Sequence, residues 1–276
     1  MSSVGQEADE LRRAIYTDGA PDRTVLVGLI ALAADDPELL PLLADVARDV
    51  LIVRGRLADT DADWLMELCG DGRGLGTYAE FEVLTSVLHH AAPAPTQIVA
   101  FAAREIERAI LTGERAVIGG QDGEPGRVRA SDVAALRAIN QGGRPDRALA
   151  EVLFDIAHAT STADNDPGFD AFFAQTLRSY LIDEAPPDAR FDAFWDALTP
   201  SPAPHAVPPM AIDGLAEASY REAAEATSER CEAAAHLPAP QAHWALAHLS
   251  RGALSSAERR LVAALRDPAR RLERAA

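Results

Sequence analysis

The sequence predicts an all-α protein built from tandem helix–turn–helix units. Hydrophobic residues make up 48% of the 276 residues but aromatic residues only 5%, so aliphatic side chains must form the core. Leu and Ala dominate that group, and both are strong helix formers. The second observation is that glycine-containing turns separate segments whose apolar residues recur with the helical period.

The first and third units share a turn that ends in Pro-Asp-Arg. The segments Asp18–Arg23 (DGAPDR) and Gly142–Arg147 (GGRPDR) align without a gap. Each turn precedes a helix, and proline in a second turn, at Asp36–Pro37 and Asp166–Pro167, marks the start of the next helix. Two apolar stripes support this alignment: Leu149, Val152, Leu153 and Ile156 in the third unit, and Leu39, Leu42, Leu43, Val46, Val50 and Val53 in the first.

The second and fourth units resemble each other through a tryptophan before a turn glycine. Trp64 and Trp244 stand eight residues before Gly72 and Gly252, respectively. Equivalent positions of repeats usually bury equivalent side chains, so we expect both tryptophans to anchor the core.

This pairing predicts an internal duplication of a two-unit helical domain. Residues 1–116 form the first copy, residues 117–126 a Gly-rich linker, and residues 127–276 the second copy. The second copy carries an insertion around residues 186–240, which contains a Pro-rich loop and a long Ala-rich helix. Insertions on a repeat scaffold often carry specificity, so we expect this one to face a partner.

The charge of the chain excludes several classes of function. The formal net charge is −17, which disfavours binding to a phosphate backbone or an anionic membrane. All 26 basic residues are arginine, which excludes Schiff-base and P-loop lysine chemistry. Two cysteines, no leader-like apolar segment and no run long enough to span a bilayer favour a cytoplasmic protein.

Acidic residues recur at the turns and at the helix starts that follow them. The matching pieces are Asp18–Gly19, Asp71–Gly72, Ala79–Glu80, Gly143, Ala150–Glu151 and Ala257–Glu258. In this the chain resembles the TerB-like tellurite-resistance domain, an all-α fold of two pseudo-symmetric helical halves. The resemblance implies stress-linked, metal-associated and partner-binding roles, with a divalent cation at Asp18, Asp71 and Glu80. The chain departs from the pattern at Val27, which stands where the third unit has Glu151, and in its last two turns, which lack the aspartate.

Two other groups of residues invite a metal-binding interpretation. Cys231, His236, His243 and His248 have ligand types that suit zinc, but spacings of five residues point apart on a helix. Asp59, Asp61 and Asp63 open like a calcium loop, but Trp64 and Gly70 occupy the positions of its glycine and closing glutamate. We favour scattered surface or core-edge residues for the first group, and for the second an N-cap at Asp61.

The sequence therefore predicts a non-enzymatic helical scaffold or adaptor that binds a protein partner and needs no cofactor. No nucleophile elbow or other catalytic motif supports an enzyme, although distant residues of a dispersed site could still converge. A stress-linked, metal-associated protein of the TerB-like kind is the alternative. A mimic of nucleic acid would need a linear array of carboxylates, and the acids here are spread among caps and exposed faces.

Overall fold

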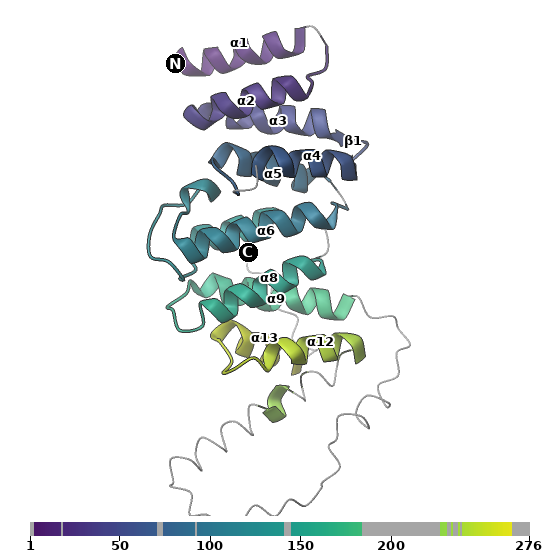
Figure 1. Cartoon of the computed structure of the whole chain (residues 1–276), viewed down its shortest axis with the longest axis vertical. Helices are drawn as coiled ribbons and strands as arrows, with labels where there is room; N and C mark the ends of the chain where they lie inside the picture. Colours follow the sequence, from purple (N-terminus) through teal and green to yellow (C-terminus); the bar gives the residue numbers. More distant parts are fainter. Residues whose placement is uncertain are drawn as a thin grey trace, which may run out of the picture. The chain divides into compact units, whose positions relative to one another are not determined.

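The computed structural model confirms the all-α prediction. It describes residues 3–17, 19–70, 74–91, 93–140, 145–183, 227–230, 233, 237 and 239–266. Their α-helices are α1 (Ser3–Thr17), α2 (Arg23–Asp35), α3 (Leu40–Leu51), α4 (Asp59–Gly70), α5 (Tyr78–His90), α6 (Thr96–Thr112), α7 (Ala130–Ile139), α8 (Arg147–Ala159), α9 (Pro167–Asp183), α12 (Ala239–Leu249) and α13 (Ser256–Arg266) (Figure 1). Two short 3₁₀ helices, η1 (Pro37–Leu39) and η2 (Ala116–Ile118), and one hairpin, β1 (Ile52–Val53) with β2 (Arg56–Leu57), complete them. None of the helices described has the length and apolar character needed to cross a membrane.

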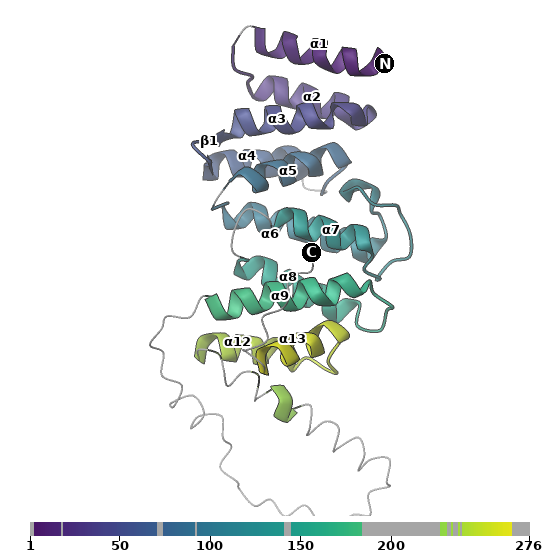
Figure 2. The same ribbon diagram turned by 180° about the vertical axis from the view of Figure 1, so that it is seen from behind.

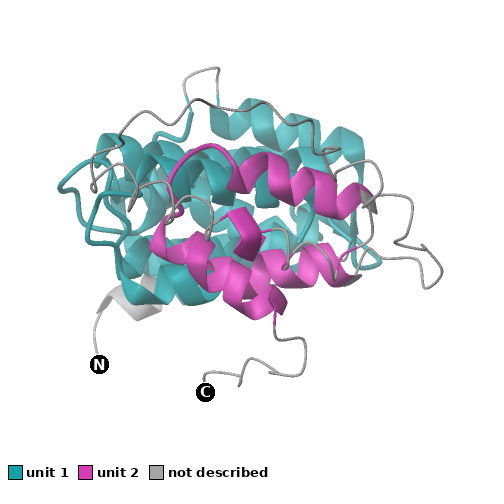
Figure 3. Ribbon diagram, turned by 90° about the horizontal axis from the view of Figure 1, so that it is seen from below, with its two compact units in different colours: residues 1–172 teal, residues 173–276 magenta. Residues whose placement is uncertain are grey.

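The chain divides into two compact units. Unit 1 comprises residues 1–172 and unit 2 residues 173–276 (Figure 3), so the division falls inside α9. The segment 117–126, which composition predicts to be a linker between domains, lies within unit 1. The internal duplication stays a prediction.

The helices of unit 1 pack in layers that follow the order of the chain. Helix α3 packs on α2 and α5, α4 and α7 each pack on α5 and α6, and α8 packs on α6. Two opposite views show α2 with α3, then α4 with α5, then α6 with α7 along the layers of this unit (Figures 1 and 2). Aliphatic side chains without solvent exposure fill the spaces between them, among them Leu26, Leu43, Leu65, Leu84, Ile98 and Ile106.

The shared Pro-Asp-Arg turn begins a helix in both places where it occurs. Asp22 is the N-cap of α2 and accepts a hydrogen bond from the Val25 N–H (3.0 Å). Asp146 is the N-cap of α8 and accepts one from the Leu149 N–H (2.9 Å). An N-cap carboxylate satisfies a donor that the helix leaves unpaired, so the motif is a helix start signal.

The two predicted apolar stripes have different outcomes. Leu149, Val152, Leu153 and Ile156 are all buried on α8, as the period predicts. The stripe from Leu39 to Val53 is wrong at its end, because α3 stops at Leu51 and Val53 is exposed in the hairpin. Arg54 and Gly55 form the two-residue turn with positive φ values of 54° and 74°, which suits the twist of a hairpin.

The segment 117–126 is fastened to unit 1 by backbone and side-chain hydrogen bonds. Gly123 N–H donates to the Gly113 carbonyl (3.0 Å) and Gly126 N–H to the Ile110 carbonyl (2.9 Å). Arg115 donates to the Glu124 carbonyl near the end of the segment and to the Arg127 carbonyl just after it. A glycine-rich composition therefore accompanies a fixed loop here, because the glycines supply positive φ angles and close backbone approach.

Arg115 is itself held by a buried ion pair with Asp132 of α7. The Nε atom of Arg115 lies 3.0 Å from both carboxylate oxygens of Asp132, and neither side chain is exposed. Asp132 Oδ2 also accepts the Arg129 N–H (2.8 Å) at the start of α7. The ion pair thus joins the loop after α6, which holds Arg115, to helix α7, which holds Asp132.

In unit 2, aromatic rings pack around Trp244 of α12. The ring of Tyr180 lies 5.2 Å from that of Trp244, and the ring of His248, one turn further along α12, lies 4.6 Å from it. Trp244 is half-buried and His248 is buried. Their ring contacts place Trp244 among the packed side chains of unit 2.

Candidate functional site

Of the three acidic residues predicted to bind a divalent cation, the structure describes Glu80, and it shows Glu80 binding backbone N–H groups. Asp18 and Asp71 lie outside the described residues. Glu80 stands in the first turn of α5, where its Oε2 accepts the Gly76 N–H (2.7 Å) and the Thr77 N–H (3.1 Å). Thr77 Oγ1 accepts the Glu80 N–H in return (3.4 Å). This reciprocal pair is a capping box, so the Glu80 carboxylate is engaged by backbone donors.

The corresponding glutamate of unit 2 makes the same arrangement. Glu258 Oε2 accepts the Ser255 N–H (2.7 Å), and Ser255 Oγ accepts the Glu258 N–H (3.2 Å) at the start of α13. The Ala-Glu pairs at 79–80 and 257–258 therefore share a structural role as helix starts. Glu151 has another role, since it forms an exposed ion pair with Arg147 (2.8 Å).

A further carboxylate, which the sequence analysis missed, holds the loop between α4 and α5. Glu105 of α6 is buried and accepts hydrogen bonds from the Leu75 N–H (2.9 Å) and from Arg108 Nε (3.0 Å). Arg108 also donates to the Leu75 carbonyl (3.1 Å). The spacing Glu105–Arg108 was a sequence signal for an ion pair on one helix, but nothing in it indicates Leu75.

The alternative metal sites are not assembled in the described part of the chain. Cys231 and His236 lie outside it, His243 is exposed, and His248 packs against Trp244. No group of three His, Cys, Asp or Glu side chains placed to hold a metal ion occurs among residues that the structure describes.

Asp61 has a different position from the one predicted. Helix α4 begins at Asp59, so Asp61 lies inside its first turn and the expected N-cap at Asp61 is wrong. The Asp61 carboxylate binds the guanidinium of Arg23, whose central carbon lies 4.6 Å from the centre of the Trp64 ring. These three side chains tie the start of α2 to α4.

The thiol of Cys69 is unsuited to nucleophilic chemistry. Cys69 is buried on α4, and burial, followed by the nearby charge of Glu80, raises the pKa of the thiol from 9.0 to about 12. A thiol acts as a nucleophile through its thiolate, which is scarce at neutral pH when the pKa is so high. Cys69 is therefore a small core residue.

We expect Cys69 to resist alkylation in the folded protein. In a Cys231→Ser variant, iodoacetamide should modify Cys69 about a hundredfold more slowly in buffer at pH 8.5 than in denaturing urea, as mass spectrometry can follow. Because the folded pKa is raised, the stability contributed by the buried thiol is complete below pH 9 and falls as the pH approaches 12. Equal rates in the two states would contradict the burial.

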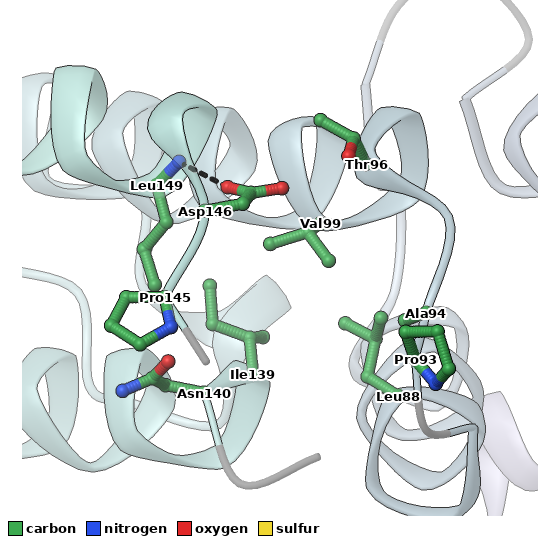
Figure 4. A pocket seen from close by; sticks show the side chains of 10 residues that line it. All are labelled: Leu88, Pro93, Ala94, Thr96, Val99, Ile139, Asn140, Pro145, Asp146 and Leu149. Carbon is green, nitrogen blue, oxygen red and sulfur yellow. Dashed lines mark hydrogen bonds between the residues drawn. The ribbon is translucent and has the colours of Figure 1, made fainter. Parts of the chain in front are cut away.

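An apolar pocket lies in unit 1 where the ends of helices from successive layers meet. It has a volume of about 310 Å³, at the lower end of ligand pockets, which span roughly 300–1,000 Å³. The end of α5, the start of α6, the end of α7 and the start of α8 line it (Figure 4). Its lining residues are Leu88, Pro93, Ala94, Thr96, Val99, Ile139, Asn140, Pro145, Asp146 and Leu149.

Asp146 is the charged group of this lining. Its Oδ1 caps α8 through the Leu149 N–H, and its second oxygen is directed away from that bond toward the side of Val99 and Thr96 (Figure 4). The side chain is half-buried. In the sequence Asp146 is recognisable only as part of a turn, because residues that form the pocket with it, such as Leu88, are distant along the chain.

The comparisons with known proteins returned no relative. No family model matches the chain, and no curated protein and no solved structure matches it. The fold and the pocket therefore define the class of this protein: it is a layered all-α protein with an apolar pocket at its helix ends. The resemblance to the TerB-like domain stays a prediction.

Proposed function

We propose that this chain is a non-enzymatic scaffold that binds a protein partner, and that the pocket between α5, α6, α7 and α8 receives a side chain of that partner. The observation that carries the proposal is the pocket itself. The apolar side chains that line this space of about 310 Å³ include Leu88, Val99, Ile139 and Leu149. Burying a partner's apolar side chain there contributes about 1.5–3 kcal/mol, which is the scale of an interface anchor.

The polar groups of the pocket support binding over catalysis. They are Thr96, Asn140 and Asp146, and Asp146 already caps a helix through one oxygen. A general acid–base or nucleophilic mechanism needs a second group within hydrogen-bond reach of the first. Glu80, Glu105 and Cys69, which are described elsewhere in unit 1, hold backbone or fill the core.

Several further expectations from the sequence stay predictions. The insertion expected to face a partner falls at residues 186–240, most of which lie outside the described residues. The divalent cation at Asp18, Asp71 and Glu80, the stress-linked alternative and the cytoplasmic location stay predictions. The absence of a cofactor does so as well.

A pair of variants on one helix tests the proposal. Val99 is half-buried in the pocket, whereas Leu111 is 39% exposed on α6 and is not among the residues that line the pocket. We expect Val99→Arg to reduce capture of a cross-linked partner from the native host by at least about tenfold, the effect of losing one anchor. Leu111→Arg should capture as much as the unchanged protein.

Quantitative mass spectrometry of the cross-linked products gives the measurement, with circular dichroism as the check that both variants fold. A partner captured equally by Val99→Arg and by the unchanged chain would refute the pocket as its binding site. So would a product that is lost only in Leu111→Arg.

A further inference from the structure

We infer that the pocket selects a basic segment of the partner, in which an apolar side chain stands next to arginine or lysine. The apolar side chain enters the pocket, and the cation meets the second carboxylate oxygen of Asp146. This inference rests on the proposed function and adds the chemistry of its ligand.

The geometry of Asp146 supports a cationic neighbour. The carboxylate lines a space whose other lining is mainly hydrocarbon, and only its Oδ1 accepts a hydrogen bond among the interactions described for this residue (Figure 4). A charge interaction is stronger where apolar walls exclude water than it is on an open surface. An anionic or purely apolar segment would offer no donor to the second oxygen of this carboxylate.

The charge of the whole chain acts in the same direction. A net charge of −17 attracts basic segments and repels acidic ones over distances up to the Debye length, about 8 Å at physiological salt. Complementary charge of this kind raises association rates and suppresses acidic partners. The electrostatic field of the whole chain brings basic segments close, and the pocket then provides the direct contact between Asp146 and the basic side chain.

The same geometry predicts little preference between the two basic side chains. Arginine is favoured over lysine where a carboxylate offers both oxygens to a planar fork. In Asp146 the Leu149 N–H already occupies one oxygen, at 2.9 Å. A single hydrogen bond to the other oxygen is within reach of either cation.

The chain contains its own control for a test. Asp22 caps α2 as Asp146 caps α8, within the same Pro-Asp-Arg turn, but Asp22 does not line the pocket. Asparagine is as good an N-cap as aspartate, so Asp146→Asn and Asp22→Asn each remove a charge while keeping the cap. The two variants differ in whether the lost charge faces the pocket.

The probes are N-acetyl-leucyl-argininamide and its neutral analogue N-acetyl-leucyl-citrullinamide, titrated into the full chain while methyl NMR signals of Val99, Ile139 and Leu149 are recorded. The arginine peptide should bind about three- to fivefold more tightly than the citrulline peptide, the ratio that a partly exposed ion pair gives. Asp146→Asn should bring the two affinities together, and Asp22→Asn should leave their ratio unchanged.

The possible failures are distinguishable. Equal affinities for the two peptides in the unchanged protein would overturn the charge selection and leave the apolar pocket as the binding site. A preference for arginine that persists in Asp146→Asn would overturn the role of Asp146. Methyl signals that respond to neither peptide would overturn the inference, and the cross-linking of Val99→Arg would then decide the proposed function independently.

Discussion

Replacing Asp132 with alanine should lower the free energy of unfolding by about 3–5 kcal/mol. The substitution leaves the guanidinium of Arg115 buried without its carboxylate, and a buried charge that loses its partner has a large desolvation penalty. It also removes the acceptor of the Arg129 N–H at the start of α7. Urea denaturation followed by circular dichroism measures the change.

The matched control is Glu151→Ala, which breaks the ion pair of Glu151 with Arg147. That pair is exposed and lies on one face of α8, so its loss should change stability by no more than about 0.5 kcal/mol. If both variants lost equal stability, the prediction that the buried Arg115–Asp132 pair contributes more to stability than the exposed pair would be wrong.

Replacing Gly113 with alanine should lower the free energy of unfolding by more than about 2 kcal/mol. Gly113 ends α6 with a φ of +84°, a left-handed conformation that side chains disfavour. A Cβ atom at this position would also overlap the Gly123 carbonyl oxygen, whose own residue donates to the Gly113 carbonyl. The loop 113–126 would have to move for the side chain to fit.

Gly28→Ala should instead raise the free energy of unfolding in the same measurement. Gly28 lies in the middle of α2, and a Cβ atom there would meet nothing within 4 Å. Alanine lowers the entropy of the unfolded chain and favours the helix, so the variant should be more stable by up to about 1 kcal/mol. A destabilised Gly28→Ala, or an unchanged Gly113→Ala, would contradict the assigned environments.

The parts of the fold that follow from local pattern could be predicted from the sequence. The stripe of Leu149, Val152, Leu153 and Ile156 is buried because a helical period places all four on one face. The acids before Pro37 and Pro167 bind the N–H groups of Glu38 and Gly168, as the N-cap interpretation requires.

Local ambiguity explains where the prediction fails. Val53 continues the period of α3, but Ile52 and Val53 are β-branched residues that also suit a strand, and the Arg54–Gly55 turn decides in favour of a hairpin. The sequence of segment 117–126 shows its glycines but not the hydrogen bonds that fix them, since these come from Arg115 and from carbonyls of α6.

The candidate pocket could not be predicted from the spacing of residues in the sequence. Its walls come from residues 88 to 149, on four helices whose mutual packing sets the space. Likewise, the acidic pieces that suggest the TerB-like pattern include Glu80 and Glu258, which form capping boxes. Thr77-x-x-Glu80 and Ser255-x-x-Glu258 match the capping-box spacing, a sequence signal that could have indicated this role, and the hydrogen bonds at both helix starts show it.

The fixed loop after α6 has a consequence for how this protein can change over generations. Surface loops ordinarily absorb insertions and deletions, and a glycine-rich one would be the first place to expect them. Here the guanidinium of Arg115 spans from Glu124 to Arg127, and one residue more or fewer would break that register. Variation in chain length should therefore accumulate elsewhere, leaving this stretch as constant in length as the helices it joins.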